Sequence, residues 1–351
     1  MDIERFEIPG LAERPDWWLV RPDEIINFCR NIKKGKVTVE ATTPLGFPVF
    51  RVVYNEIEHK NKVNWISAVG TKNPEIFNDS DMQTVMISGG IHGCEIEGTV
   101  LVMNLISLLE TGRDLRGKEN PEIVELAKKY SLVLFPCVNM DGRAISPDHR
   151  MNADVDSCRR SGGGWWKDGR TIVWPEMKEY FPLPLEEVGY RGGYPNSEGY
   201  NIQLDASPGG IRTEEAKAIL KAADEKRIDL FLNLHSQPGS PNVFITQPSV
   251  SGYPSQTKIT FELARACMGA WEKLGYKYAP DTELSTNARV DINSAVQLCS
   301  GAAVATVEYP AKDAGSFDRI LETGYVLLDV VFKYGKEHKF CDRKNWLINN
   351  K

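Results

Sequence analysis

The chain has 351 residues, of which 42% are hydrophobic and 26% charged, and its formal net charge is −6. This composition is typical of a globular domain in water. No block of five like charges is present, so we expect neither a nucleic-acid partner nor attraction to an anionic membrane. No stretch approaches 18 uninterrupted apolar residues, so no membrane span is expected.

The first ten residues, "MDIERFEIPG", contain acidic residues and no apolar run, which is unlike a signal peptide. The seven cysteines are odd in number and include no CxxC pair. This pattern favours reduced thiols over a disulfide framework. We therefore expect a cytoplasmic protein, and the sequence gives no indication of its oligomeric state.

Strands and helices are predicted to alternate along most of the chain. Apolar or β-rich runs predict strands at 37–55 (two strands around a Pro-Leu-Gly-Phe-Pro turn), 84–90, 131–142 (ending in a polar turn), 228–240 (running into a loop) and 302–310. Apolar residues at helical spacing predict helices at 95–112, 213–226, 259–275 and 319–336. This alternation indicates an α/β fold whose largely parallel sheet is covered on both faces.

Residues 156–200 do not follow this alternation, because they are rich in Gly, Pro and aromatic residues. The segment reads as a long irregular insertion in one domain that spans 1–351, rather than as a second domain. Loops of this length inside a compact domain are often functional.

Polar side chains follow four of the predicted strands. They are His92 with Glu95, Asn139 with Asp141, His235, and Glu308. Ligands of open α/β sheets bind at the carboxyl ends of the strands. The four strand ends therefore suggest one common site.

The residue types in this set fit zinc. Three His and Glu ligands leave a fourth position for water, as in catalytic zinc sites, and zinc lowers the pKa of that water to about 7. A nearby carboxylate that is not a ligand can take the proton and pass it to a leaving amine, and Glu308 is the candidate. The glycines of "SGGIHGCEIEG" (88–98) allow a tight turn in which His92 and Glu95 converge on one ion.

Four segments, "GGIHGCEIEGT", "VNMDG", "LHSQPG" and "ATVEYP", resemble in this order the landmarks of the zinc carboxypeptidase family, which includes the pancreatic carboxypeptidases. The resemblance covers residues 40–335. It implies a single α/β domain with a mixed, twisted sheet of about eight strands. It also implies Zn²⁺ as cofactor, with His92, Glu95 and His235 as ligands and Glu308 as general base.

The resemblance fails at the motif that holds a substrate's free carboxylate, which in the family reads roughly G-V-D-L-N-R-N. In one register, 199–210, Gln203 and Leu204 stand where the family has Asn and Arg. In the other, 152–161, Arg159 is kept but a cysteine replaces Asn. The helix that follows favours the first register.

The acidic residue of the same motif instead favours the second register. It falls on Asn201 in the first and on Asp156 in the second, and only the second keeps a carboxylate. Leucine cannot pair with a carboxylate, whereas arginine forms a two-pronged ion pair with it. In the first register the anchor is therefore lost, unless another arginine replaces it. The candidates are Arg159, Arg160, Arg191 and Arg289.

Further substrate contacts are expected from other segments. Arg150, which follows the "NMDG" landmark, is the candidate for polarising the scissile carbonyl. Gln203 and Arg289 are candidate substrate-binding residues together with Arg159, and Asp291 and Asn293 are further polar candidates for a specificity pocket. The mobile tyrosine of the digestive enzymes has no clear counterpart in 284–297.

The leading hypothesis is a zinc-dependent metallopeptidase that hydrolyses a peptide or peptide-like amide bond by zinc-activated water with Glu308 as base. An alternative is a zinc-dependent N-acyl amino acid deacylase or amidase acting on small substrates. A non-catalytic binding homologue is disfavoured, because all three ligands and the base are present.

Overall fold

The computed structural model describes residues 4–59, 65, 68, 71–77, 80–206, 209–238, 243–246, 254–276, 290–312 and 314–343. The strands are β1 (Lys36–Thr42), β2 (Pro48–Tyr54), β3 (Gln83–Ser88), β4 (Tyr130–Phe135), β5 (Gly164–Trp166), β6 (Val188–Arg191), β7 (Leu230–Gln237), β8 (Val243–Thr246) and β9 (Ala303–Pro310). The α-helices are α1 (Pro22–Arg30), α2 (Glu97–Thr111), α3 (Pro121–Ala127), α4 (Met140–Ile145), α5 (Val155–Gly163), α6 (Trp174–Met177), α7 (Glu214–Glu225), α8 (Pro254–Lys273), α9 (Ile292–Ser300) and α10 (Phe317–Glu337). Two 3-10 helices are η2 (Pro74–Phe77) and η3 (Ile202–Leu204).

The main sheet follows the order β1-β2-β4-β3-β7-β9-β8. Its four central strands, β4, β3, β7 and β9, are parallel, and antiparallel pairs flank them on both sides. The expected mixed sheet is confirmed. It has seven strands in the described part of the chain, rather than about eight, because the remaining two strands pair only with each other.

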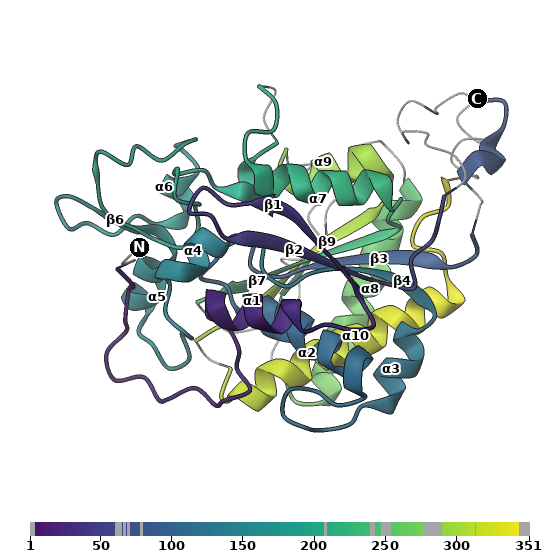
Figure 1. The fold of residues 1–351 in the computed structure, drawn as a ribbon, viewed down its shortest axis with the longest axis horizontal. Coiled ribbons are helices and arrows are strands. Elements are labelled where there is room, and N and C mark those ends of the chain that lie inside the picture. The colour runs from purple at the N-terminus through teal and green to yellow at the C-terminus, as the bar shows by residue number, and fades with distance from the viewer. Residues whose placement is uncertain are drawn as a thin grey trace.

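Helices cover both faces of the sheet (Figure 1). Leu230, Leu232 and Leu234 of β7 belong to the core shared with α2, α8 and α10. Phe231, which points the other way, belongs to the core shared with α7 and α9. Because side chains alternate along a strand, His235 lies on the same face as Phe231, at the carboxyl end of β7.

The segment at 156–200 is more regular than expected. It contains most of α5, the short α6, and the two-stranded antiparallel sheet of β5 and β6. The pairing of these two strands is not visible in a Gly-rich and aromatic sequence, because strands of three and four residues are too short to show an alternating pattern. Figure 1 shows α5, α6 and β6 beside the main sheet, close to the N-terminus.

Two smaller findings concern the helices and the cysteines. In the portions of the chain that the structure describes, no helix is long and apolar enough to cross a membrane. All seven cysteines are free thiols, and six of them are buried.

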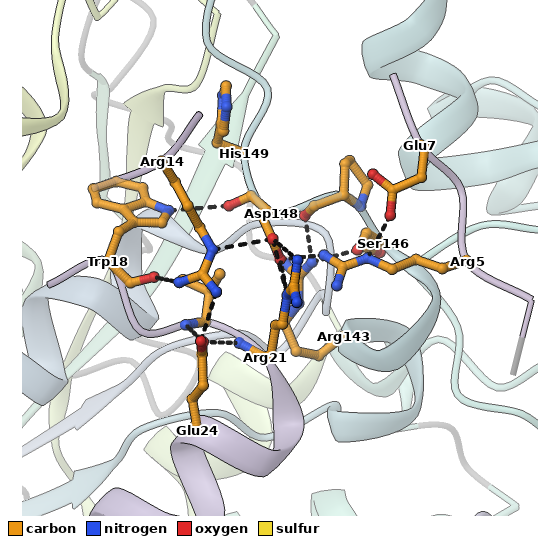
Figure 2. A network of polar contacts seen from close by, with 12 residues as sticks. Arg5, Glu7, Arg14, Trp18, Arg21, Glu24, Arg143, Ser146, Asp148 and His149 are labelled. Atoms are coloured by element: carbon orange, nitrogen blue, oxygen red, sulfur yellow. Dashed lines mark hydrogen bonds and ion pairs between the residues drawn. The ribbon is translucent and has the colours of Figure 1, made fainter. Parts of the chain in front are cut away.

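A network of ion pairs joins the N-terminal segment to the loop between α4 and α5 (Figure 2). At its centre is Asp148, whose carboxylate accepts hydrogen bonds from Arg5, from Nε of Arg14 (3.0 Å) and from Nη2 of Arg21 (2.8 Å). Nε1 of Trp18 donates to the backbone oxygen of Asp148 at 3.0 Å. These contacts fix the loop just before Arg150.

The charge of Asp148 should stabilise the fold in a pH-dependent way. Burial disfavours its ionised form, but Arg21, Arg5 and Arg14 outweigh burial and hold the pKa of Asp148 well below its usual range. Its stabilising effect is therefore complete above the unfolded-state pKa, about 3.9, and is lost as the pH falls further. We expect Asp148→Asn to lower the free energy of unfolding by about 2 kcal/mol at pH 7, measured by urea denaturation.

The same experiment at pH 3 should show a smaller difference between Asp148→Asn and the wild type. Asp16→Asn is the matched control, since Asp16 is exposed in the same segment, and it should change stability by less than about 0.5 kcal/mol. An equal loss of stability at both pH values would contradict the assigned role of the charge.

Candidate metal centre

His92 and Glu95 lie in the tight connection between β3 and α2. The backbone N–H of Glu95 donates to the backbone oxygen of His92 at 3.0 Å, which closes the turn. Between them, Gly93 packs so closely on α4 that a Cβ atom would lie 2.1 Å from the backbone nitrogen of Arg143. Glycine is required here by this close approach of two backbones.

His235 completes a buried group of three side chains. Oε2 of Glu95 lies 2.8 Å from Nδ1 of His235 and 3.2 Å from Nδ1 of His92. One potential ligand atom from each residue lies within 4.8 Å of the others. Burial opposes the charge of Glu95, but the two imidazoles outweigh it and hold the pKa of Glu95 well below its usual range.

The group fits a zinc ion. Two His and one Glu are a known catalytic ligand set, and all three side chains are buried. Nδ1 of His92 and Nε2 of His235 have no hydrogen bond among the described residues, although both atoms are buried. A buried nitrogen without a partner is costly, and a bound metal would give His92 Nδ1 the partner that it lacks.

Asn201, at the start of η3, orients the ring of His92. Its Oδ1 lies 3.1 Å from Nε2 of His92, so this nitrogen carries the proton and donates it, which leaves Nδ1 for a metal. Asp156, the acidic residue of the other register, instead pairs with Arg160 and Thr171 on the surface of the insertion. The first register therefore places its residue beside the metal group, and the second does not.

Asn201→Ala should weaken zinc binding about 10- to 100-fold, because the His92 ring loses its orienting acceptor. Zinc affinity measured by competition with a chromophoric chelator checks this. Asn55→Ala is the control, since its side chain bonds only backbone oxygens near β4, and it should leave the affinity unchanged. Equal zinc affinity in Asn201→Ala and the wild type would contradict the role of Asn201.

Glu308 lies directly beside His235. The two residues are register partners on the adjacent parallel strands β7 and β9, so their side chains leave the sheet on the same face. Burial is the main factor that raises the pKa of Glu308, to about 7, and the charge of Glu95 adds to it, while His235 and Arg150 act in the opposite direction. Such a carboxyl can exchange a proton near neutral pH.

Arg150 is fully buried in the loop after α4. Its Nη2 donates to Oγ of Ser236, the residue after His235, at 2.6 Å. Its Nε and Nη1 are buried without a hydrogen-bond partner in the described residues. A buried guanidinium with two unused donors is suited to bind an oxygen that carries negative charge.

The sequence pattern of the zinc carboxypeptidases matches residues 61–300, which contain all three candidate ligands. The chain belongs to the zinc carboxypeptidase family. Its cofactor is accordingly Zn²⁺, and it is a zinc metallohydrolase. A comparison with curated protein sequences finds no significant match.

Solved structures share this fold at low sequence identity. A metallocarboxypeptidase from Burkholderia cenocepacia is 14% identical with a TM-score of 0.54, over 89% of this chain and 68% of the other. A Pseudomonas aeruginosa metallocarboxypeptidase, bound to (2-guanidinoethylmercapto)succinic acid, is 13% identical with a TM-score of 0.55, over 90% and 68%. Bovine thrombin-activatable fibrinolysis inhibitor, bound to a tick carboxypeptidase inhibitor, is 14% identical with a TM-score of 0.51, over 96% and 100%.

The predicted carboxylate anchors of this zinc carboxypeptidase lie in different places. Arg159 is exposed on α5, and among the described residues no hydrogen bond or ion pair joins it to the metal group, so the structure does not bring it to the site. The reason is that α5 turns its neighbour Cys158 inward. Arg160 pairs with Asp156, and Arg191 donates to the backbone of Pro195. Arg289 lies outside the described residues.

Gln203 lies next to the metal group, within a buried network of amides. Its Oε1 accepts from Nδ2 of Asn233 at 2.8 Å, and the same nitrogen donates to Asn293 at 2.9 Å. Nδ2 of Asn293 donates to Thr306 at 2.9 Å. Since Asn233 and Thr306 precede His235 and its register partner by two residues, the network lies on the same face of the sheet, one step deeper.

Two aromatic residues of the insertion were missed by the sequence analysis. The rings of Trp174 and Tyr194 contact the ring of His92 edge to face, with centroids 5.1 and 4.7 Å away. No motif or periodicity marks either residue, because their position depends on how the insertion folds back over the turn after β3.

Proposed function

We propose that this zinc carboxypeptidase hydrolyses a peptide or peptide-like amide bond, with Glu308 as general base and Arg150 as the group that polarises the scissile carbonyl. The observation that carries the proposal is the position of Glu308 beside the three ligands, on the neighbouring strand and facing the same way. A zinc ion, when bound, activates a water molecule and withdraws electrons from a carbonyl oxygen.

The side chains of this chain would act on either side of the reacting bond. Glu308 takes a proton from the attacking water and delivers it to the leaving nitrogen, for which a pKa near 7 is well suited. Arg150 donates from Nε and Nη1 to the carbonyl oxygen as that oxygen gains negative charge. Ser236 holds Nη2 and thereby fixes the guanidinium.

We further propose that the substrate is not held by an Asn-Arg clamp on a free C-terminal carboxylate. The hydrogen bond between Asn201 and His92 supports the register in which Leu204 occupies the arginine position. Leu204 is an apolar residue at the end of η3 and offers no donor. An internal peptide bond, a γ-glutamyl or cell-wall peptide, or an N-acyl group would suit such a site.

A second candidate function is the deacylation of N-acyl amino acids or similar small amides. It is favoured by the packing of Trp174 and Tyr194 against His92, since these rings from the insertion narrow one side of the site. A narrow site accepts a small amide more readily than an extended peptide.

Matched substrates test both candidates. The zinc-loaded protein is incubated with peptides that have free C-termini, with the same peptides amidated, and with a panel of N-acyl amino acids, and products are read by mass spectrometry. We expect cleavage that does not depend on the free C-terminus. Release of single residues only from the peptides with free C-termini would refute the proposal that the clamp is absent. Cleavage of the N-acyl amino acids alone would select the second candidate function.

We also propose a cytoplasmic location. The seven free cysteines support it, because cytoplasmic proteins keep their thiols reduced. Fractionation of cells that produce the protein at its native level, followed by immunoblotting of each fraction, tests this location.

A further inference from the structure

Tyr194 is held rigidly beside the metal group by contacts at both ends. Its backbone N–H donates to Gly162 at 2.9 Å, and its backbone oxygen accepts from Nδ2 of Asn139 at 3.0 Å. Its ring contacts the rings of His92 and Trp174 edge to face. The side chain is only 7% exposed. Tyr194 is therefore fixed by packing, and not placed there by a flexible loop.

Gly162 of α5 also contacts the ring of Tyr194. A Cβ atom at Gly162 would lie 2.6 Å from two ring carbons of Tyr194 and 2.9 Å from its hydroxyl oxygen. The phenol therefore packs directly on the backbone of Gly162, in the space that a side chain would occupy.

The hydroxyl of Tyr194 has no hydrogen bond to any residue that the structure describes. The hydroxyl oxygen is not fully shielded from solvent, so it is available for a bound molecule. Its ring contacts His92, one of the three candidate ligands. An unperturbed tyrosine titrates at about pH 10, so the phenol is a neutral hydrogen-bond donor at neutral pH.

We propose that the Tyr194 hydroxyl is a second donor, beside Arg150, to the substrate oxygen that gains negative charge during hydrolysis. The proposal rests on the proposed function of the same site. The phenol donates a hydrogen bond and keeps its proton, so no bond to Tyr194 forms or breaks. Preorganised donors of this kind stabilise the transition state more than the ground state, because the charge develops only there.

This role makes Tyr194 a catalytic residue that the insertion supplies. It differs from a packing role in one respect that can be measured. The ring alone would suffice to pack against His92, whereas the proposed role needs the hydroxyl oxygen. Tyr194→Phe keeps the ring and removes only that atom.

The test compares Tyr194→Phe with Tyr180→Phe. Tyr180 belongs to the same insertion, and its ring packs on Trp166 rather than on the metal group. For each protein, calorimetry gives the affinity for zinc and, on the zinc-loaded protein, the affinity for inorganic phosphate, a tetrahedral oxyanion. We expect Tyr194→Phe to bind phosphate about tenfold or more weakly, with zinc affinity unchanged within twofold, and Tyr180→Phe to match the wild type.

A kinetic readout supplements the binding data. On an amide substrate of the wild type, Tyr194→Phe should lower kcat about tenfold or more and change KM by less than about threefold, because the donor acts in the transition state. Equal phosphate affinity in Tyr194→Phe and the wild type overturns the proposal, and so does a zinc-loaded wild type that binds no phosphate. A loss of zinc affinity in Tyr194→Phe also overturns it, because the hydroxyl would then support the metal site itself. A wild type that binds no zinc refutes the proposed function itself, which is a separate result.

Discussion

Glu308→Gln should keep its zinc and lower kcat by about 10²–10⁴-fold. The amide has the shape of the carboxylate but cannot take a proton from water, so the contribution of the general base is lost. Because Glu308 is not among the three clustered ligands, metal content should be unaffected. Zinc is measured by atomic absorption on the purified protein, and kcat on the substrate identified by mass spectrometry.

Glu187→Gln is the matched control, because Glu187 is exposed in the insertion, and its activity should equal that of the wild type. Normal turnover by Glu308→Gln would remove Glu308 from the mechanism. Loss of zinc from the same variant would instead make it a ligand. The two outcomes are read from independent measurements, so neither can be mistaken for the other.

The same residue sets a pH dependence. The base must be ionised to act, so kcat/KM should fall as the pH drops through the pKa of Glu308, which burial raises to about 7. A zinc ion beside the carboxylate favours its charged form, and therefore places this acidic limb at or below pH 7. The residual kcat/KM of Glu308→Gln should not show this fall at acidic pH.

The second large effect is on stability. Zinc would bind the folded chain through three buried side chains, of which His235 lies far in sequence from His92 and Glu95, so it should raise the free energy of unfolding. At free zinc a thousandfold above Kd the gain is about 4 kcal/mol, and Tm rises by several degrees. His235→Ala should abolish this zinc-dependent rise, which differential scanning fluorimetry measures with and without a chelator.

His338→Ala is the control for a lost imidazole. His338 caps α10 and packs on Tyr334, away from the metal group, and the variant should keep the zinc-dependent rise. The rise should also diminish at acidic pH, because metal ligands must be deprotonated and protons compete with zinc for them. A wild-type Tm that is the same with and without zinc at every pH would contradict the metal site.

The sequence was informative wherever a strand leads into the site. His92, Glu95, His235 and Glu308 follow apolar runs whose strand character is clear, and parallel strands bring such ends together. The sheet itself was predictable for the same reason. Its parallel centre follows from strands that are apolar on both faces.

Prediction is harder where the position of a residue depends on contacts that the sequence does not encode locally. Arg159 keeps the residue type of a clamp, yet the packing of α5 turns it to solvent. Asn201 has the less expected residue type, yet its oxygen meets the ring of His92. Tyr194 belongs to a segment without periodicity, and its backbone hydrogen bonds with Gly162 and Asn139 hold it at the site.

The register between β7 and β9 has a consequence for how this fold diversifies. His235 and Glu308 lie side by side on two adjacent central strands, so the distance between them is fixed by the backbone hydrogen bonds of the sheet. Trp174 and Tyr194, by contrast, lie outside the main sheet, in the segment between α5 and η3. Substitutions in that segment can therefore change which amide is recognised, while the proposed ligand His235 and the proposed base Glu308 stay in place with the sheet.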